Sequence, residues 1–294
     1  MLPISMVLEA VKIPVQVLEH LLTQVSEFRL PPLGLLKALI LQRIERIRSE
    51  RELERELHKR PYWVRACGLP RVPDHSTFRV FRKRLGDKTE DIFHPLVTEL
   101  VHKNIVSADT LAIDSTHLKA YSNRHVQSDR DASFGHKTKK KVFYGYKEHI
   151  LCDTKTELPV AVLVSTGKDN DAKHAVPLLD KSLLVIRTKL RTMLGDAAYY
   201  TTDFYNRIIH YGAKPITASR NRTHALPKKY NERTSVERCF SRSKLSFNLD
   251  SLTVRGLPKV TQHCLLCCTS MLVLALAAHQ HNQPYNARSV TSII

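Results

Sequence analysis

Three acidic residues occupy places where the elements of an α/β protein could bring them together. Asp114 follows the apolar strand core LAI, and Asp196 follows the short apolar run TMLG. Because the carboxyl ends of strands in an open α/β sheet meet at one crevice, side chains at those ends can face a common ligand. Glu237 lies on a predicted helix, beside an apolar stripe that would pack on the sheet. The sequence therefore predicts three converging carboxylates.

The chemistry open to such a trio is metal-dependent. A charged residue that ends an apolar strand loses solvation, and a divalent cation can compensate for that loss. Mg²⁺ takes one or two carboxylates and keeps phosphate oxygens and water as its other ligands. Two cations about 3.5–4 Å apart stabilise both the attacking and the leaving oxygen in phosphodiester chemistry. Taken singly, however, an Asp after a strand is more often a turn or cap residue.

A stripe on the predicted helix could bind the phosphates of a nucleic acid. In YNERTSVERCFSRSK, the residues Tyr230, Arg233, Glu237 and Lys244 are separated by three, four and seven positions, which are steps that return to one helix face. Arg can fork onto phosphate oxygens, Lys acts as a mobile point charge, and Tyr can stack on an unpaired base. The alternative is the charged, solvated face of an ordinary amphipathic helix.

The charge balance indicates a polyanionic partner. Lys and Arg number 46 against 28 Asp and Glu, which gives a net charge of +18, spread along much of the 294 residues. Each cation set against a phosphate releases counterions and adds affinity without sequence readout. An ordinary soluble basic protein would have the same balance, so charge alone does not assign the partner.

Cysteine usage and the apolar segments favour a cytoplasmic protein. The six cysteines show no regular disulfide framework, which is typical of a reducing compartment. The strongest apolar run, 264–278, is shorter than the roughly 20 residues that cross a bilayer, so we expect a buried helix. Its start, HCLLCC, raises the question of zinc, but structural zinc sites usually need four ligands with matching spacing, and helix packing is favoured.

Helical periodicity extends from residue 1 to about 104. Within this range a turn at 68–73 leads to an Asp74 cap and a compact basic helix that ends at Gly86. Two short helices around such a turn, with the second one basic, fit a helix-turn-helix-like DNA-binding region. A solvated basic face on an ordinary helix is the alternative. The candidate DNA contacts on this helix are Arg79, Arg82 and Lys83.

The pattern changes near residue 105 to alternating strands and helices, an order that predicts an α/β fold with a mixed sheet. We expect this domain to cover 105–281, followed by a tail at 282–294. The predicted elements, in order, are a strand at 110–114, two strands joined by a turn at 153–157, a helix at 172–183, a strand at 190–194, a helix at 202–211, a strand at 214–218, and helices at 230–246 and 258–279.

Two further groups of charged residues have open interpretations. The stretch HKTKKKVFYGYK, which includes Lys140 and Lys147, would either clamp DNA or form a solvated loop. The remaining aspartates nearby are expected to be caps, turn residues or surface charges. These aspartates are Asp129, Asp131, Asp153 and Asp169.

Several motifs, in this order, resemble those of the DDE transposases of bacterial and archaeal insertion sequences. They are LAIDSTHLKAY, YGYKEHILCD, GKDNDAKHAVPLL and MLGDAAYY. The sharpest match is the Y-x2-R-x3-E-x6-K signature, which is formed here by Tyr230, Arg233, Glu237 and Lys244. The resemblance covers roughly residues 33–279, nearly the whole chain.

The resemblance implies a fold and a set of site residues. It implies an RNase H-like catalytic core, in which Asp114, Asp196 and Glu237 are the catalytic ligands of Mg²⁺ or Mn²⁺, with two ions per site. It also implies that the other three residues of the signature contact DNA close to the scissile phosphate. Only 40 residues separate Asp196 from Glu237, so the large β-rich insertion that some relatives carry there is absent, and any mechanism that relies on that insertion is in doubt.

The expected function is DNA transposition. Such a protein binds the terminal inverted repeats of its element, hydrolyses phosphodiester bonds at the ends and joins the 3′ ends to target DNA. Its partners are double-stranded DNA and at least one further copy of itself, with no membrane and no small-molecule substrate, in a prokaryotic cytoplasm close to the nucleoid. Two alternatives remain: an RNase H-like nuclease without strand transfer, and a transposase-derived DNA-binding regulator.

Overall fold

The computed structural model describes residues 2–23, 30–138, 141–186, 190–199, 201–218 and 226–288. Contacts between residues divide the chain into two compact units. We call them the helical unit, which comprises Met1–Leu96, Ser243–Thr253 and Leu265–Ile294, and the core unit, which comprises Val97–Arg242 and Val254–Cys264.

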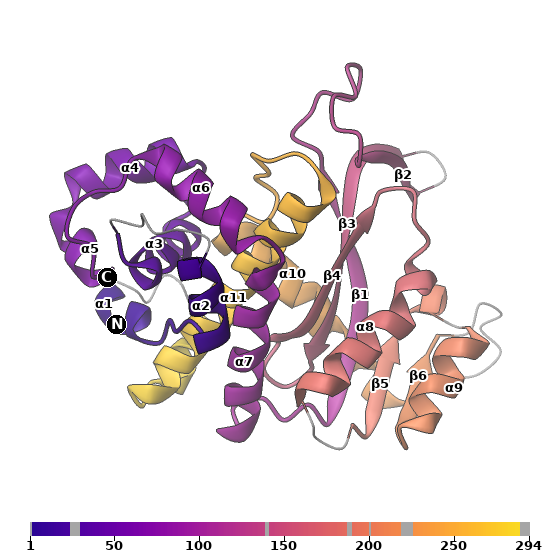
Figure 1. Cartoon of the computed structure of the whole chain (residues 1–294). Helices are drawn as coiled ribbons and strands as arrows, with labels where there is room; N and C mark the ends of the chain where they lie inside the picture. The colour runs from indigo at the N-terminus through magenta and orange to yellow at the C-terminus, as the bar shows by residue number, and fades with distance from the viewer. Residues whose placement is uncertain are drawn as a thin grey trace. The chain divides into compact units, whose positions relative to one another are not determined.

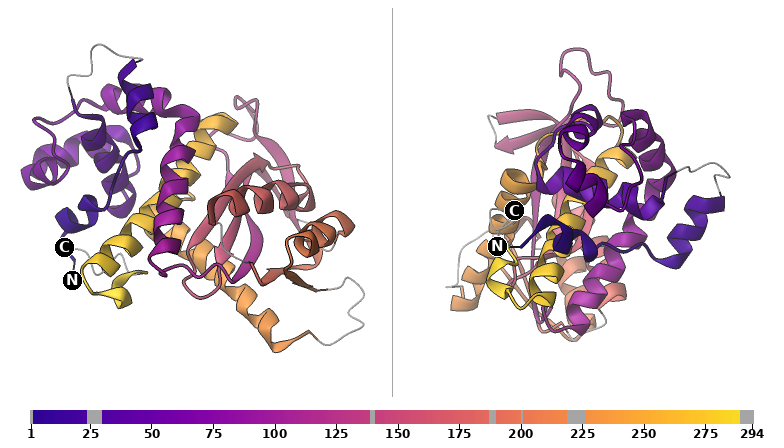
Figure 2. Two further views of the ribbon diagram at one scale, coloured as in Figure 1. Left: turned by 60° about the horizontal axis from the view of Figure 1, so that its bottom comes forward. Right: turned by 90° about the vertical axis from the view of Figure 1, so that its left-hand side faces the viewer.

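The N-terminal part of the chain is helical, as predicted (Figures 1 and 2). Proline at the first helical position starts α3 and α5, where its missing N–H leaves no helical hydrogen bond unmade. The elements are α1 (Ile4–Glu9), α2 (Val15–Thr23), α3 (Pro32–Ile44), α4 (Glu50–Lys59), α5 (Pro61–Ala66), α6 (His75–Leu85), η1 (Gly86–Lys88) and α7 (Thr89–His102).

Helices α4 and α6 contact each other, and the chain between them forms α5 and the predicted turn. Leu53 of α4 and Phe78 of α6 are fully buried in the unit. The Asp74 carboxylate caps α6, because it accepts a hydrogen bond from the backbone N–H of Ser76 at 2.7 Å. Gly86 ends the helix with a φ of 46°, a left-handed value that favours glycine. The predicted cap and the predicted end of this helix are confirmed.

The core unit contains a six-stranded mixed sheet. Strand β4 is mostly apolar and valine-rich, β5 is buried along its length, and β1 is buried over its first four residues, 110–113, and more polar beyond them. Strand β2 was not anticipated from the sequence. The strands are β1 (Thr110–Lys119), β2 (Ser133–Thr138), β3 (Lys141–Asp153), β4 (Pro159–Thr166), β5 (Thr192–Gly195) and β6 (Lys214–Thr217).

The strand order confirms the predicted α/β fold with an RNase H-like core. The path through the sheet is β2-β3-β1-β5-β6, and β4 pairs with β3 beside β2. Strands β1, β3 and β4 pair antiparallel, whereas β5 is parallel to β1 and β6 is parallel to β5. Helix α8 (Asp171–Ile186) connects β4 to β5 and packs on β3 and β4, and α9 (Thr202–His210) connects β5 to β6 (Figure 1).

The segment that carries the Y-x2-R-x3-E-x6-K signature is built differently from the single helix that was expected. Residues Lys228–Arg233 form a 3₁₀ helix, η3, and the α-helix α10 begins at Thr234 and ends at Phe247. Pro227 precedes η3 and has no backbone N–H, so it cannot donate a helical hydrogen bond to a preceding turn. Because side chains at i and i+3 eclipse in a 3₁₀ helix, Tyr230 and Arg233 still share a face.

The last long helix, α11, runs from Leu257 to Gln280 and is long and apolar enough by composition to cross a membrane. Within its most apolar stretch, however, 94% of the residues are buried inside the protein. The predicted buried helix is therefore confirmed, and its sequence HCLLCC lies in that buried stretch. The Cys267 thiol contacts the backbone carbonyl of Phe247 at 3.2 Å.

Candidate active site

The parallel pairing of β1 with β5 sets Asp114 and Asp196 at one level of the sheet. Ala112 pairs with Leu194, and each aspartate lies two residues further along its own strand direction. Asp114 accepts a hydrogen bond from the backbone N–H of Ser115 at 2.8 Å. Asp196 accepts one from the backbone N–H of Ala198 at 2.8 Å. Asp196 therefore follows the end of β5, as predicted, whereas Asp114 lies inside β1, which continues to Lys119 along β3. The prediction that the first strand ends at Asp114 is wrong, because pairing with β3 extends β1 beyond the last residue that pairs with β5.

Arg233 links two of the three predicted carboxylates. Its Nη1 lies 3.1 Å from Oδ2 of Asp114, and its Nη2 lies 2.6 Å from Oε1 of Glu237. The Arg233 side chain is 19% exposed, whereas that of Glu237 is 53% exposed, so the cluster opens to solvent on the Glu237 side. The guanidinium also lies 5.9 Å from the ring of Tyr230. The planar fork of an arginine suits such a bridge between two carboxylates.

The pKa of Asp114 reports how closely these groups gather. The pKa of this carboxyl is raised to about 6, mainly by burial and also by the negative charges of Asp196 and Glu237, while the N–H of Ser115 and the charge of Arg233 act in the opposite direction. Burial also raises the pKa of Tyr230, whose hydroxyl senses Arg233, Asp196 and Asp114. The structure thus brings Asp114, Asp196, Glu237, Arg233 and Tyr230 into one electrostatic cluster.

Asp171 forms a hydrogen-bond network with Ser115, the residue next to Asp114, and with Lys147. The Ser115 hydroxyl donates a hydrogen bond to Oδ2 of Asp171 at 2.9 Å. Lys147 donates to Oδ1 of Asp171 and to the backbone carbonyl of Asp169, both at 2.8 Å. Asp171 is the first residue of α8. The spacing of its partners in the chain gave no signal of this network, because Lys147 and Ser115 lie on two different strands.

The contacts of Lys147 leave it unavailable for a phosphate in this conformation. Its side chain is 11% exposed and is held by the carboxylate and the carbonyl named above. Arg82 is similar, because it is 7% exposed and its Nη1 lies 2.6 Å from Oε1 of Glu50. Both residues were expected at DNA, and both are used inside their own units.

The other expected DNA contacts are distributed differently. Arg79 and Lys83 are exposed on α6. Lys244, on α10, has its Nζ 3.6 Å from Oδ1 of Asp250, a contact weak enough to exchange for another anion. Lys140 lies outside the described residues.

The donor set of the cluster fits a hard divalent cation. Carboxylate oxygens are the ligands that Mg²⁺ and Mn²⁺ prefer, and here strand β1, the residue after β5 and helix α10 supply them. At present Arg233 supplies the positive charge between Asp114 and Glu237, so a cation bound by these two side chains would have to displace the guanidinium.

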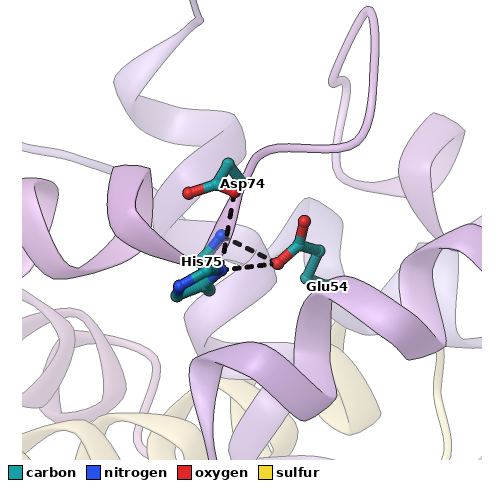
Figure 3. A group of neighbouring side chains, drawn as sticks. All are labelled: Glu54, Asp74 and His75. Carbon is teal, nitrogen blue, oxygen red and sulfur yellow. Dashed lines mark hydrogen bonds and ion pairs between the residues drawn. The ribbon is translucent and has the colours of Figure 1, made fainter.

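A different group satisfies simple distance criteria for a metal site (Figure 3). In the part of the chain that the structure describes, Glu54, Asp74 and His75 bring their ligating atoms within 4.8 Å of one another. Nδ1 of His75 lies 2.8 Å from Oε2 of Glu54, and the backbone N–H of His75 donates to the same oxygen at 3.1 Å. Together with the Asp74 cap, these bonds satisfy the N-terminus of α6, so helix capping accounts for the group.

Comparison with family models identifies transposase domains in both parts of the chain. The model described as Transposase DDE domain matches residues 107–273. The model described as Transposase domain (DUF772) matches residues 7–84. The first match includes Asp114, Asp196 and Glu237, and the second includes most of α6.

Similar curated proteins are the probable transposases for insertion sequence element ISH11 of two Halobacterium salinarum strains, R1 and NRC-1. Each is 27% identical to this chain over 179 residues, which are 60% of this chain and 51% of the relative. The chain thus spans about half the length of the curated relatives that it matches.

Similar solved structures include the catalytic core domain of BIV integrase, with 12% identity, a TM-score of 0.34, and coverage of 54% of this chain and 82% of that chain. The piggyBac transposase synaptic complex with hairpin DNA has 9% identity, a TM-score of 0.48, and coverage of 99% and 79%. Because the Transposase DDE domain model matches more than half of the sequence, this chain belongs to the transposase DDE domain family.

Proposed function

We propose that this chain is an insertion-sequence transposase that binds the terminal inverted repeats of its element, hydrolyses phosphodiester bonds at the ends and joins the 3′ ends to target DNA. The observation that carries the proposal is the cluster in which Arg233 bridges Asp114 and Glu237 and the charge of Asp196 acts on Asp114, in a chain of the transposase DDE domain family. Cytoplasmic location and the division into 1–104, 105–281 and a tail at 282–294 are parts of the same proposal.

Asp114, Asp196 and Glu237 would hold the divalent cations, Mg²⁺ or Mn²⁺, and the proposed number is two. When bound, the cations activate the attacking water or 3′-hydroxyl and stabilise the leaving oxygen. The chain itself needs no nucleophile for this chemistry. Its contribution is to hold three carboxylates at fixed positions: the N–H of Ser115 and that of Ala198 orient the two aspartates.

The positive and aromatic residues of the signature would hold the DNA end. Arg233 can exchange its carboxylate partners for the oxygens of a phosphate, because both offer a planar or forked acceptor to the guanidinium. Tyr230 and Lys244 would contact the same end by stacking and by point charge. On the helical unit, the exposed Arg79 and Lys83 are the proposed contacts to the duplex outside the cleavage point.

Pairing of two element ends requires two active sites, so the working complex is proposed to be a homodimer or a larger assembly on double-stranded DNA. Two alternatives would leave a different signature. A nuclease of the same fold would cut the end without joining it, and a strand-transfer assay with a pre-cut end would give no joined product. A DNA-binding regulator would bind the repeats and cut nothing.

The first test is Glu237→Gln, because this change removes a carboxylate and preserves the shape of the side chain. We expect binding to the inverted repeat to be retained and cleavage with Mg²⁺ to be lost, by at least about 100-fold. Asp203→Asn, an exposed position in the first turn of α9, is the matched control and should cleave like the parent protein. Near-normal cleavage by Glu237→Gln would contradict the assignment.

A further inference from the structure

Side chains of the turn between β3 and β4 bind two segments of the candidate active site: the start of β1, which carries Asp114, and α10, which carries Glu237. The turn contains Asp153, which ends β3, and Glu157, which precedes β4. The backbone N–H of Glu157 donates to the carbonyl of Asp153 at 2.8 Å, and that of Asp153 donates to the carbonyl of Leu158 at 3.0 Å. The predicted turn is thus present, but its two acidic residues are buried instead of exposed.

Asp153 fastens the turn to the start of the strand that carries Asp114. Its Oδ1 accepts hydrogen bonds from the backbone N–H of Ala108 at 3.0 Å and from the hydroxyl of Ser107 at 3.1 Å. The backbone N–H of Thr154 donates to the carbonyl of Thr110, the first residue of β1, at 3.1 Å. Three hydrogen bonds therefore join the turn to β1 and to the residues just before it.

Glu157 fastens the turn to the helix that carries Glu237. Nε of Arg238 lies 2.5 Å from Oε1 of Glu157, and Nη2 of Arg242 binds Oε2. Nη1 of Arg242 also donates to the backbone carbonyl of Glu157 at 3.3 Å. The Glu157 side chain is only 8% exposed, and these two arginines supply the counter-charge that a buried carboxylate needs.

The geometry of α10 makes this contact directional. Arg238 follows Glu237 directly, and Arg242 lies one helical turn further along the same face as Arg238. Consecutive residues on an α-helix point about 100° apart, so fixing the Arg238 face fixes the direction in which Glu237 projects. A third bond, from the Thr154 hydroxyl to Oε2 of Glu232 at 3.1 Å, fastens η3, which carries Tyr230 and Arg233.

The backbone at Glu157 adopts a left-handed conformation, as do six other non-glycine residues among those that the structure describes. The φ of Glu157 is 59°, in the left-handed region that few non-glycine residues adopt. A glycine would relieve this conformation but could not bind the two arginines. Unfavourable backbone conformations persist where surrounding contacts hold them, and such positions cluster at functional sites.

We infer that Glu157 is a positioning residue: through Arg238 and Arg242, and with Asp153 bound to β1, it sets the orientation of Glu237 relative to Asp114. We call the contacts of Glu157 with the two arginines, together with the contacts of Asp153 next to β1, the clamp. This inference rests on the proposed function, since the clamp would position a carboxylate that holds a cation. Glu157 itself touches no DNA and no reacting atom in this role.

The test compares Glu157→Gln with Asp180→Asn in the full chain. The glutamine keeps one acceptor oxygen and loses the charge that holds both arginines. Asp180→Asn is the matched control, because it weakens an ion pair of the same kind between α8 and α9, in which Nη2 of Arg207 lies 2.7 Å from Oδ2 of Asp180. Fractions folded are measured for each protein, and all rates are expressed per folded molecule.

With DNA saturating, we expect Glu157→Gln to cleave about 10- to 100-fold more slowly and to need more Mg²⁺ for half-maximal rate, because a carboxylate misplaced by about 1 Å costs that much. Binding of the inverted repeat in Ca²⁺ should be unchanged. A parent-like rate and Mg²⁺ requirement, or a loss explained wholly by the unfolded fraction, would overturn the inference.

A second readout separates failure of the clamp from failure of the proposed function. If the parent protein does not cleave the repeat, or if Glu237→Gln cleaves normally, the proposed function fails. The clamp is then judged by hydrogen exchange of the α10 amides at 234–242. Faster exchange in Glu157→Gln than in Asp180→Asn supports the clamp, and equal exchange overturns it.

Discussion

At the scale of single residues, Arg233 places one positive charge between two of the three crowded carboxylates. Its two nitrogens reach Asp114 and Glu237 across 119 and four positions of the chain. One guanidinium carries one positive charge, which is less than two divalent ions would supply. The carboxyl of Asp114 therefore keeps a pKa raised to about 6 by burial and by its acidic neighbours.

Replacing Arg233 by Gln should make the DNA-free protein a better cation binder. The change frees one oxygen of Asp114 and one of Glu237, and it removes a competing positive charge. We expect Mn²⁺ to bind roughly tenfold more tightly, equal to about 1.4 kcal/mol, as measured by electron paramagnetic resonance titration. Cleavage of the inverted repeat should fall in the same variant, because the proposed phosphate contact is lost. Unchanged or weaker Mn²⁺ binding would show that the guanidinium does not compete for the carboxylates.

Asp114 should make the metal-free protein less stable as the pH rises from about 4 to 6. The folded-state pKa, about 6, lies above the ordinary value of 3.8, so the folded state holds a proton that the unfolded state has already released. The penalty is absent below pH 4, grows between these values and is fully present at pH 7, where it is on the order of 3 kcal/mol.

Asp114→Asn removes this titration. We expect the variant to exceed the parent in free energy of unfolding by about 1–3 kcal/mol at pH 7, since the loss of the Arg233 contact offsets part of the gain, and the difference should shrink toward pH 4. Urea denaturation at pH 4, 5, 6 and 7 measures both proteins. A difference that does not depend on pH would contradict the raised pKa.

At the scale of elements, α6 carries one arginine that forms a buried ion pair and one that is exposed to solvent. Arg82 points inward and pairs with Glu50 of α4, whereas Arg79 is exposed. Burial alone would raise the pKa of Glu50, and the charge of Arg82 reverses this effect, so the pKa of that carboxyl is lowered. The ion pair fastens α6 to α4, and the exposed face of α6 stays available for a partner.

The pair Arg82→Met and Arg79→Met should separate stability from DNA binding. Arg82→Met leaves a largely buried carboxylate without its partner and should lower the free energy of unfolding by about 2–4 kcal/mol. Arg79→Met should change stability by less than about 0.5 kcal/mol.

DNA binding of the folded variants should show the opposite order. Arg79→Met should weaken duplex binding and reduce the salt dependence of log K by about 1, as expected for one lost phosphate contact. Denaturation curves and binding isotherms at several salt concentrations measure the two effects. Equal salt dependence of Arg79→Met and the parent would remove Arg79 from the proposed interface.

At the scale of the whole molecule, the basic residues that give the net charge of +18 fall into two groups. Some of the cations bind carboxylates inside a unit, as Lys147, Arg82 and Arg242 do. Others, such as Arg79 and Lys83, face solvent. A count of basic residues therefore overstates the surface that a polyanion could meet, although the sign of the net charge is the one expected for the proposed partner.

The sequence by itself determined the α/β class, the strands at Asp114 and before Asp196, the buried helix predicted at 258–279 and the cap and end of α6, although it ended the first strand at Asp114 and β1 continues to Lys119. The single elements follow from patterns within about 10–25 neighbouring residues, where periodicity and turn chemistry act directly, and the α/β class follows from the order of those elements. The spacing of the Y-x2-R-x3-E-x6-K signature also predicted that Tyr230, Arg233 and Glu237 act together, although it assigned all of them to one α-helix.

Only the tertiary structure decided which charged groups bind one another. Lys147 meets Asp171 across 24 residues, Arg82 meets Glu50 across 32, and Arg238 meets Glu157 across 81. A side chain's own neighbours in the sequence do not record such partners, because burial creates the demand for a counter-charge only after distant segments have packed. The same reason hid the clamp at the β3–β4 turn, whose two acidic residues have the sequence appearance of an ordinary exposed turn.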